Sequence, residues 1–440
     1  MTLCLSRRAH TPSGCALLLR LFIFCFVLRA VVGHAQDRPS DAALGLYEMT
    51  DSASVAMPVV RRRILMRKDS LWNRALRIHY NALVMDGHID TPTLMLHDKY
   101  DFGVRHLSRQ AQVDLPRMFD GGLDAAFFSI FVPSYFGEGQ RATARAQVMI
   151  AEVKRQVAAH ADTVAMAYST DDVRRITRAG KKAILMGLEG GHALAASPDV
   201  LRELYDEGIR YVTLTHVNTN AWADASQSPP RWGGLNDLGR RMVREMNRLG
   251  ILVDLSHVSD STFYDAIAVT KAPVILSHSS ARALTDVVRN VNDDMLRAVA
   301  ANGGVVMINF YASMVNRRLT PEVMDEVYRR LGGRHGDLRR MWDVIADVRH
   351  ERGIPTGTLD DVLAHIDHAV RVAGIDHVAL GSDFDGARMP HGLADVTRLP
   401  WVTYGLLKQG YSETDIYKIL GGNTLRVLEA AERIALPPRP

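Results

Sequence analysis

The chain has 440 residues, of which 47% are hydrophobic, and its formal net charge is +4. This length exceeds that of a small domain and accommodates one (β/α)₈ barrel with additional segments. Lysine and arginine are interspersed with aspartate and glutamate, and no run of basic residues alternates with aromatic ones. Nucleic acid is therefore excluded as an expected partner.

The N-terminus has the organisation of a secretory signal peptide. Arg7, Arg8 and His10 precede a strongly apolar stretch at 16–32, and small residues at positions 33 and 35 flank His34. This pattern predicts export, to the periplasm or the outside of the cell, with cleavage after position 35. An uncleaved membrane anchor is the alternative; the apolar stretch is short for a spanning helix and contains two arginines, which disfavours it.

All three cysteines, Cys4, Cys15 and Cys25, fall within this N-terminal stretch. The mature protein is thus expected to contain no disulfide and no thiolate that could bind metal or act as a nucleophile. Residues 36–65 are polar and mixed, which is typical of a flexible lead-in, and we predict one domain over 66–440. No stable membrane anchor is expected after signal cleavage, and a homodimer is compatible with the sequence.

From position 83 onward, short apolar runs alternate with longer amphipathic ones. Continuous apolar runs are typical of strands that are buried on both faces of a parallel sheet. Helices are predicted at 142–160 and 237–249, the second with an apolar stripe. These repeats favour a closed α/β barrel of the (β/α)₈ (TIM) type over an open sheet. The eight predicted strands are 83–85, 125–132, 183–188, 211–214, 251–255, 274–276, 305–310 and 378–380.

The interval between the seventh and eighth predicted strands, 312–376, is too long for one helix. Thr358 and Asp361 have the spacing of a helix start with its capping residue, and an amphipathic run continues from there to position 372. The remainder of the interval is predicted to form an added helical segment over the barrel.

Residues that can bind metal ions or move protons follow six of the predicted strands. In a barrel, the C-terminal ends of all strands meet at one mouth, where active sites lie. Packing alone does not explain six such positions at the same end. They are His88 and Asp90, Glu189 and His192, His216, His257, His278, and Asp383 and Asp385.

Five of these residues have the chemistry of a zinc site. His88 and Asp90 are two apart in an extended segment, so their side chains point the same way. Two glycines follow Glu189 and allow close approach of a ligand. Singly, each residue would more often belong to a turn, an ion pair or a packed core. Together with His257 and His278 they offer nitrogen and oxygen but no sulfur, which suits Zn²⁺. Five ligands fit two zinc ions about 3.5–4 Å apart that share a carboxylate and activate a bridging hydroxide.

The ordered set of motifs resembles the membrane (renal) dipeptidase family, from about position 80 to 426. No single motif decides this, but the set and its order are specific. In that family Ile89 often corresponds to a polar Asn, a departure that leaves the ligands intact. The motifs are DGHID (86–90), GLEGG (187–191), LTH (214–216), WAD (222–224), DLSH (254–257), SHSS (277–280), RNVN (289–292), GSDFDG (381–386) and GGN (421–423).

The resemblance implies a (β/α)₈ barrel that holds two zinc ions. It implies that His88, Asp90 and Glu189 hold the first ion. Glu189 would then bridge to a second ion, which His257 and His278 complete.

The resemblance also implies roles for residues outside the ligand set. His216 would contact the substrate carbonyl and the developing oxyanion. Arg289 would bind the C-terminal carboxylate of the substrate; without the family match, an ordinary surface arginine is the better interpretation. Asp383 would carry the proton from the bridging water to the leaving amine, with Asp385 as the alternative. We interpret His192, His365 and His368 as structural, the last two as solvated.

The resemblance, together with Arg289, predicts a zinc-dependent dipeptidase whose substrates are small dipeptides, including those with a C-terminal D-residue, as in the family. A metal-dependent amidohydrolase that acts on another small amide, ester or lactam is the first alternative. Such barrels usually begin with His-x-His and often bridge their metals with a modified lysine, whereas here no lysine ends a core strand. A non-enzymatic exported binding protein is the second alternative. Retention of all five ligands and of Asp383 disfavours it.

Overall fold

Parallel strands form the centre of the structure, a computed structural model that describes residues 70–97, 100–334, 337 and 340–435. The signal peptide predicted at 1–35 and the lead-in predicted at 36–65 lie outside the described residues and stay predictions. The described strands are β1 (Met85–Ile89), β2 (Ala125–Phe131), β3 (Val164–Met166), β4 (Lys182–Glu189), β5 (Ile209–Thr213), β6 (Leu252–Asp254), β7 (Ile275–Ser279), β8 (Val305–Ile308) and β9 (Val378–Leu380).

Eight of these strands close into a barrel in the order β1, β2, β4, β5, β6, β7, β8 and β9. The barrel closes where Asp86 of β1 pairs with Leu380 of β9, and every neighbouring pair is parallel. The predicted (β/α)₈ barrel is therefore confirmed, with each of the eight predicted strands in place. β1 differs in extent, because it continues through His88 to Ile89 and so includes part of the first polar motif.

Strand β3 was not predicted from the sequence. Its three residues pair with 182–184 of β4, while 186–189 of the same β4 edge pair with β5. β3 thus adds to the barrel wall at the end opposite the mouth. A three-residue strand is too short to show a hydrophobic pattern of its own.

Strand β4 shows how the sequence aims a carboxylate into the barrel. Ala183 and Leu185 belong to the hydrophobic cluster inside the barrel, whereas Ile184 and Leu188 belong to the cluster between strands and helices. Because side chains alternate along a strand, Glu189 points inward, in line with Ala183 and Leu185. Glu189 is the last residue of β4, so it lies at the mouth.

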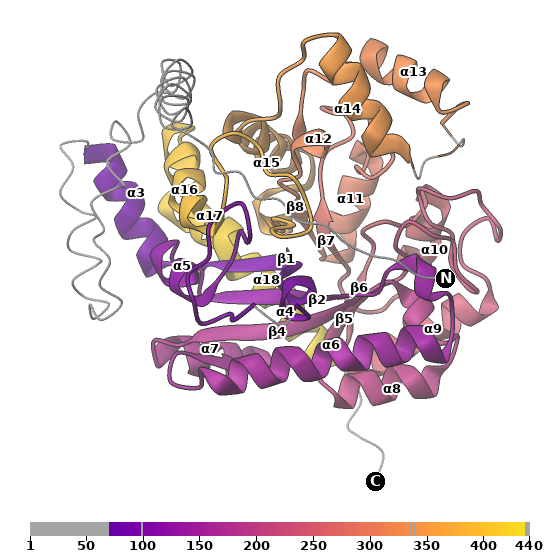
Figure 1. Cartoon of the computed structure of the whole chain (residues 1–440), viewed down its shortest axis with the longest axis horizontal. Coiled ribbons are helices and arrows are strands. Elements are labelled where there is room, and N and C mark those ends of the chain that lie inside the picture. The colour runs from indigo at the N-terminus through magenta and orange to yellow at the C-terminus, as the bar shows by residue number, and fades with distance from the viewer. Residues whose placement is uncertain (1–69, 98–99, 335–336, 338–339, 436–440) are drawn as a thin grey trace, which may run out of the picture. The chain divides into compact units, whose positions relative to one another are not determined.

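Helices surround the barrel (Figure 1). The predicted helices at 142–160 and 237–249 are confirmed as α6 and α9. The described helices are α3 (Ser70–Asn81), α4 (Thr91–Met95), α5 (Leu115–Asp120), α6 (Gln140–Ala159), α7 (Thr170–Arg178), α8 (Pro198–Asp206), α9 (Asp237–Leu249), α10 (Asp260–Val269), α11 (Asp293–Asn302), α12 (Ala312–Val315), α13 (Pro321–Arg330), α14 (Met341–Glu351), α15 (Leu359–Ala373), α16 (Leu399–Lys408), α17 (Glu413–Tyr417) and α18 (Asn423–Ile434).

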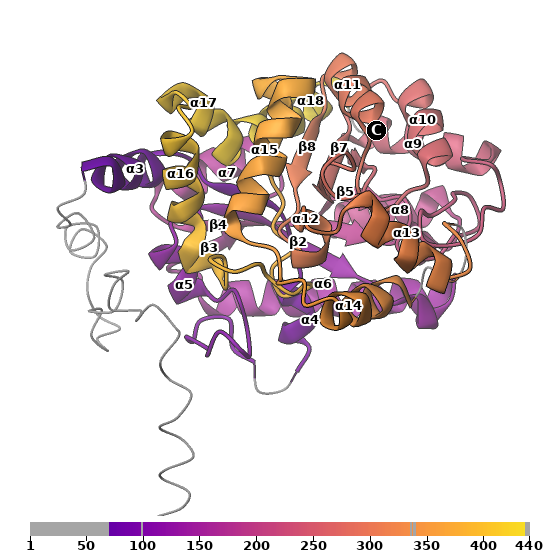
Figure 2. The same cartoon turned by 90° about the horizontal axis from the view of Figure 1, so that it is seen from above.

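The predicted added segment between the last two barrel strands consists of α12, α13 and α14, which we call the cap. Figure 2 shows α13 and α14 side by side next to α12. The cap has a hydrophobic cluster of its own, built around Met324, Val327, Met341 and Ile345. Helix α15 then returns to the barrel and begins as predicted, with a reciprocal capping box between Thr358 and Asp361.

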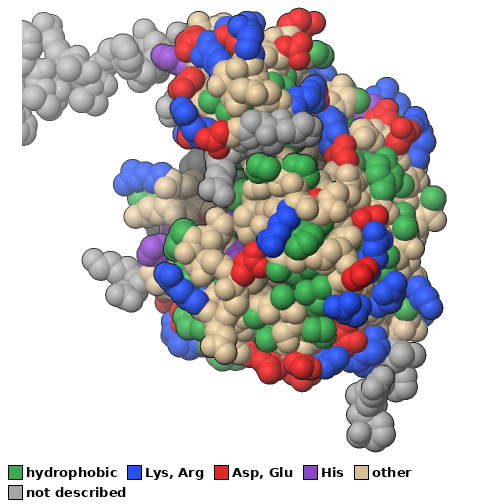
Figure 3. Space-filling view, turned by 90° about the vertical axis from the view of Figure 1, so that its right-hand side faces the viewer, with side chains coloured by type: hydrophobic (Ala, Val, Ile, Leu, Met, Phe, Trp, Pro, Cys, Tyr) green, Lys and Arg blue, Asp and Glu red, His purple; other side chains and the backbone are tan. Residues whose placement is uncertain are grey.

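The surface seen in Figure 3 carries acidic and basic side chains interspersed rather than in blocks of one sign. Ion pairs within one helix include Arg175 with Asp172 in α7 and Arg330 with Glu326 in α13. Among the described residues, no helix combines the length and the apolarity that a membrane crossing requires.

Candidate active site

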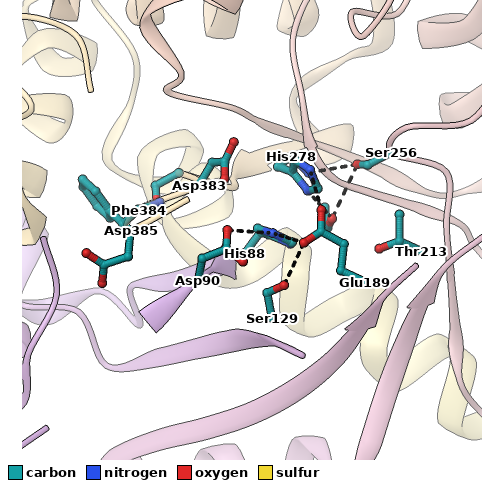
Figure 4. A network of polar contacts seen from close by, with 12 residues as sticks. His88, Asp90, Ser129, Glu189, Thr213, Ser256, His278, Asp383, Phe384 and Asp385 are labelled. Atoms are coloured by element: carbon teal, nitrogen blue, oxygen red, sulfur yellow. Dashed lines mark hydrogen bonds and ion pairs between the residues drawn. The ribbon is translucent and has the colours of Figure 1, made fainter. Parts of the chain in front are cut away.

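The structure brings the predicted polar residues together at the mouth of the barrel (Figure 4). They come from the C-terminal ends of six strands or from the loops that follow those strands. The residues and their positions are His88 in β1, Asp90 just after it, Glu189 at the end of β4, His216 after β5, His257 after β6, His278 in β7 and Asp383 after β9.

Glu189 lies at the centre of this group, with its two carboxylate oxygens facing different histidines. Its Oε2 is 3.4 Å from Nε2 of His88. Its Oε1 is 3.1 Å from Nε2 of His257 and 3.5 Å from Nε2 of His278. His216 Nε2 is slightly farther from Oε1, at 3.8 Å. A carboxylate divided in this way can bridge two metal ions.

The donor atoms in this group are buried and poorly satisfied by the protein itself. His88 Nε2 and Asp90 Oδ1 have no hydrogen-bond partner among the described residues. The Nε2 atoms of His257 and His278 face each other at 2.8 Å. Buried polar atoms normally have partners, so a cluster of unmatched donor atoms calls for a bound group. Three overlapping sets of residues could each hold a metal ion, because within each set the ligand atoms lie within 4.8 Å of one another. The sets are His88, Glu189 and His278; Glu189, His216 and His257; and His88, Asp90 and Asp383.

Two carboxylates of the site, Glu189 and Asp383, have opposite pKa shifts. Burial opposes ionisation of Glu189, but His88 and His257 outweigh it and hold the pKa of Glu189 well below its usual value. Burial, together with the nearby negative charge of Asp90, raises the pKa of Asp383 well above its usual value. The site therefore separates a firmly ionised carboxylate from one that holds a proton more readily.

The site keeps two of its histidines, His257 and His278, neutral. Burial, and then the charge of Arg289, hold the pKa of His257 well below its usual value. Burial, and then His88, do the same to the pKa of His278. A neutral imidazole offers a lone pair, which is the form that binds a metal ion.

Arg289 lies in the segment between β7 and α11. It is buried, with 4% of its surface exposed, and its Nη2 donates to the backbone oxygen of His278 at 3.4 Å. Burial lowers its pKa to about 10, so it stays charged at neutral pH. Among the described residues, none forms an ion pair with it. A buried guanidinium without a counter-ion is suited to an anionic group of a ligand.

The geometry separates Asp383 from Asp385, the alternative proton carrier. Asp385 points away from the cluster (Figure 4), where it accepts hydrogen bonds from Thr91 Oγ1 at 2.6 Å and from the backbone N–H of Gln112 at 2.5 Å. Asp383 faces the cluster, and its Oδ2 accepts from Asn309 Nδ2 at 3.0 Å. Asp383 is therefore the carboxylate that can reach a reacting atom.

Two residues of the site, His257 and Asp383, have a left-handed backbone conformation. His257 has φ of 69° and Asp383 has φ of 64°, a conformation that costs energy outside glycine. The loop around Asp383 also depends on Gly386. A Cβ atom there would lie 2.0 Å from Asp90 Oδ2 and 2.6 Å from Asp383 Oδ1.

Sequence reasoning missed residues that hold the site from behind. Tyr211 in β5 is fully buried, and its hydroxyl lies 2.7 Å from His88 Nδ1. Its ring reaches across the barrel because Gly187 leaves room: a Cβ at 187 would lie 2.0 Å from Tyr211 Cζ. Ser129 in β2 donates to Glu189 Oε2 at 2.9 Å. Both are polar residues at inward positions of barrel strands, which is the signal that could have identified them.

The prediction that both histidines of α15 are solvated is wrong for His365. His365 is fully buried, and its Nδ1 accepts from the backbone N–H of Ala281 at 3.0 Å. His368 is partly exposed and lies 2.7 Å from Asp293. His192 is buried beside the site, and its structural role stays a prediction.

The family model for membrane dipeptidase (Peptidase family M19) matches residues 72–438. The chain belongs to the membrane dipeptidase family. The resemblance seen in the motifs is thereby confirmed, and the chain is a dipeptidase-type hydrolase among the metallopeptidases. Two fungal relatives are similar over most of its length. Dipeptidase tcpJ of Claviceps purpurea is 37% identical and covers 80% of this chain and 77% of its own. Dipeptidase verJ of Clonostachys rogersoniana is 33% identical, with 86% and 91% covered.

Solved structures agree with this assignment. The probable dipeptidase PvdM from Pseudomonas aeruginosa superposes with a TM-score of 0.74 at 27% identity, covering 84% of this chain and 100% of its own. A metallopeptidase from Rhodobacter sphaeroides, liganded with a phosphinate mimic of the dipeptide L-Ala-D-Ala, has a TM-score of 0.66 at 28% identity, with 80% and 99% covered.

Proposed function

We propose that the protein is a binuclear zinc dipeptidase that hydrolyses small dipeptides, including those with a C-terminal D-residue. The observation that carries this proposal is the pairing of two features at one mouth. One is Glu189, divided between His88 on one side and His257 and His278 on the other. The other is the buried guanidinium of Arg289, which forms no ion pair among the described residues.

Zinc fits the donor set. Imidazole nitrogen and carboxylate oxygen are ligands that Zn²⁺ accepts, and the buried His88 Nε2 and Asp90 Oδ1 have no hydrogen-bond partner among the described residues. His88, Asp90 and Glu189 would hold one ion, and Glu189, His257 and His278 the other. When bound, the pair would supply Lewis acidity and a hydroxide nucleophile at neutral pH.

The remaining residues would act on the substrate. Arg289 binds the C-terminal carboxylate through two parallel hydrogen bonds, which restricts the substrate to a short peptide. His216 donates from Nε2 to the oxygen of the scissile carbonyl as negative charge develops there. Asp383 carries the proton to the leaving amine on Oδ1, because its Oδ2 is engaged by Asn309.

Acceptance of a C-terminal D-residue is supported by the ligand of the Rhodobacter sphaeroides relative, a mimic of L-Ala-D-Ala. We also propose that the chain is exported, because its first 35 residues have the organisation of a signal peptide. N-terminal sequencing of the mature protein tests the cleavage after position 35. Light scattering measures the molar mass in solution and so tests whether the protein forms a homodimer.

A substrate panel tests the proposed function. The zinc-loaded protein is given L-L and L-D dipeptides, the corresponding dipeptide amides, N-acyl amino acids, small esters and lactams. We expect free dipeptides of both kinds to be cleaved and the amides to be poor substrates. Cleavage of N-acyl amino acids, esters or lactams in preference to dipeptides would replace the proposal with the broader amidohydrolase function. A folded protein that binds less than one zinc per chain, even with zinc added, would indicate a non-catalytic binding protein.

A further inference from the structure

A fully buried carboxylate that the mechanism above does not use lies behind His278. Asp254 is the last residue of β6. Its Oδ1 accepts from the backbone N–H groups of Ser256 at 3.0 Å and Ser277 at 2.8 Å. Its Oδ2 accepts from Thr213 Oγ1 at 2.5 Å and from Ser277 Oγ at 2.6 Å. Four donors converge on this carboxylate, which connects β5, β6 and β7 inside the barrel.

Ser277 joins this carboxylate to the candidate metal ligand. Its Oγ lies 2.6 Å from Asp254 Oδ2 and 2.8 Å from His278 Nδ1. A serine hydroxyl has one proton to donate, and an ionised carboxylate can only accept. The Ser277 proton therefore points to Asp254, and the hydroxyl oxygen accepts from His278. It follows that Nδ1 of His278 carries the ring proton.

Consequently the other ring nitrogen of His278 has a free lone pair. This Nε2 faces the cluster, 3.5 Å from Glu189 Oε1 and 2.8 Å from His257 Nε2. We propose that Asp254 and Ser277 are positioning residues that fix the tautomer of His278 and thereby set the affinity of the second zinc position. The inference rests on the proposed function, since it presupposes that zinc binds there.

The two other histidines proposed as zinc ligands show why the relay, the chain of hydrogen bonds from Asp254 through Ser277 to His278, matters at the second position. His88 has the hydroxyl of Tyr211 at 2.7 Å from its Nδ1. His257 has no partner at Nδ1 among the described residues. The second zinc position thus has one oriented histidine, His278, and its orientation depends on Ser277. Partners of this kind typically change metal affinity by about 10–100-fold when removed.

The test compares two single substitutions at the same carboxylate oxygen. Ser277→Ala removes the hydroxyl that contacts His278. Thr213→Val removes a hydroxyl bonded to the same Asp254 Oδ2, at nearly the same distance, but leaves the contact with His278 intact. Zinc-loaded full-length protein is titrated with a competing chelator, and zinc per chain and the melting temperature are measured for each variant.

We expect Ser277→Ala to weaken the more labile zinc by about 10–100-fold, while Thr213→Val leaves both zinc affinities close to those of the unaltered protein. Thermal stability should fall more in Ser277→Ala, which loses two buried hydrogen bonds, than in Thr213→Val, which loses one. Equal weakening of zinc in the two variants, or unchanged zinc in Ser277→Ala, overturns the relay. If the unaltered protein itself binds no zinc, the proposed function fails instead, so the two failures are distinguishable.

A third variant tests whether the hydroxyl proton of Ser277 points to Asp254. It also replaces Ser277→Ala as the test if that variant does not fold. In Asp254→Asn, the amide oxygen must remain on the side of the two backbone N–H groups, which cannot turn. The new NH₂ group then faces Ser277 Oγ and donates to it, so the hydroxyl proton turns to His278 Nδ1. This reverses the tautomer and places a proton on Nε2. We expect zinc binding at least as weak as in Ser277→Ala, and zinc affinity equal to that of the unaltered protein would overturn the proposal.

Discussion

Two parts of the molecule hold the two halves of the candidate site. His88, Glu189 and His278 lie in barrel strands, each paired with a neighbour on both sides. Arg289 lies outside the strands, in the segment between β7 and α11. The proposed metal ligands are therefore positioned by the barrel, whereas the proposed carboxylate-binding residue needs another support.

The cap supplies that support. Val287, two residues before Arg289, is fully buried in the hydrophobic cluster of the cap. Asn290 Nδ2 donates to the backbone oxygen of Met314 in α12 at 2.8 Å. Tyr328 Oη in α13 donates to the backbone oxygen of Asp286 at 2.8 Å. Changes in the barrel should therefore act on zinc binding, and changes in the cap on substrate binding.

The largest effect is expected on the barrel side, from Glu189→Gln. The substitution keeps the shape of the side chain but removes the charge divided between the two groups of histidines. We expect zinc to fall from about two ions per chain to one or none, and dipeptide hydrolysis to fall to near background. Metal analysis of the folded variant checks this. Two tightly bound zinc ions in Glu189→Gln would show that it does not bridge them.

Asp383→Asn separates proton transfer from metal binding. The amide cannot carry the proton to the leaving amine, so we expect kcat to fall by about 10²–10⁴-fold while zinc stays bound. Asp385→Asn is the matched comparison, because Asp385 faces Thr91 and Gln112 instead. Its effect on kcat should be much smaller. Loss of zinc from Asp383→Asn would make Asp383 a ligand, and a larger loss of kcat in Asp385→Asn would reverse the assignment.

Arg289→Ala tests the other half of the site. Removing one partner of a buried charge pair costs about 2–5 kcal/mol, so kcat/KM for free dipeptides should fall by roughly 30- to 5,000-fold, mainly through KM. Dipeptide amides, which lack the carboxylate, should change little, and zinc should be retained. Arg240→Ala is a suitable control, since Arg240 in α9 is already paired with Asp265 in α10 at 3.1 Å. Equal losses on free dipeptides and on amides would refute the role given to Arg289.

The smallest effect is expected from the contact between the cap and the Arg289 segment. Asn290→Ala removes the hydrogen bond to Met314 and a second one to the backbone oxygen of Thr285. We expect a loss of about 1–3 kcal/mol in the free energy of unfolding and a moderate rise in KM, with zinc unchanged.

Asn302→Ala provides the matched control for that substitution. Asn302 bonds the backbone of Val274 and Ala272, away from the cap. It should lower stability without changing KM. A KM that is equally raised in both variants, or unchanged in Asn290→Ala, would mean that the cap does not position Arg289.

This contrast also explains what could be predicted from the sequence. The barrel was predictable because apolar runs mark its strands. The residues at its mouth, such as Glu189 and His278, were predictable because they stand where those apolar runs end. Tyr211 and Ser277 were not identified as supporting residues, because their contacts depend on which side chains face each other across the barrel. The link between Asn290 and α12 joins segments that only tertiary packing brings together. His365 was misjudged because one face of α15 packs against the segment after β7.

The most direct measurement is a zinc titration of the metal-free, folded protein while hydrolysis of one L-L and one L-D dipeptide is followed. Two zinc ions at the barrel mouth predict that activity rises with bound zinc and reaches its maximum at about two ions per chain. Full activity in the metal-free protein, or a maximum at one ion with no second binding event, would contradict a binuclear zinc dipeptidase.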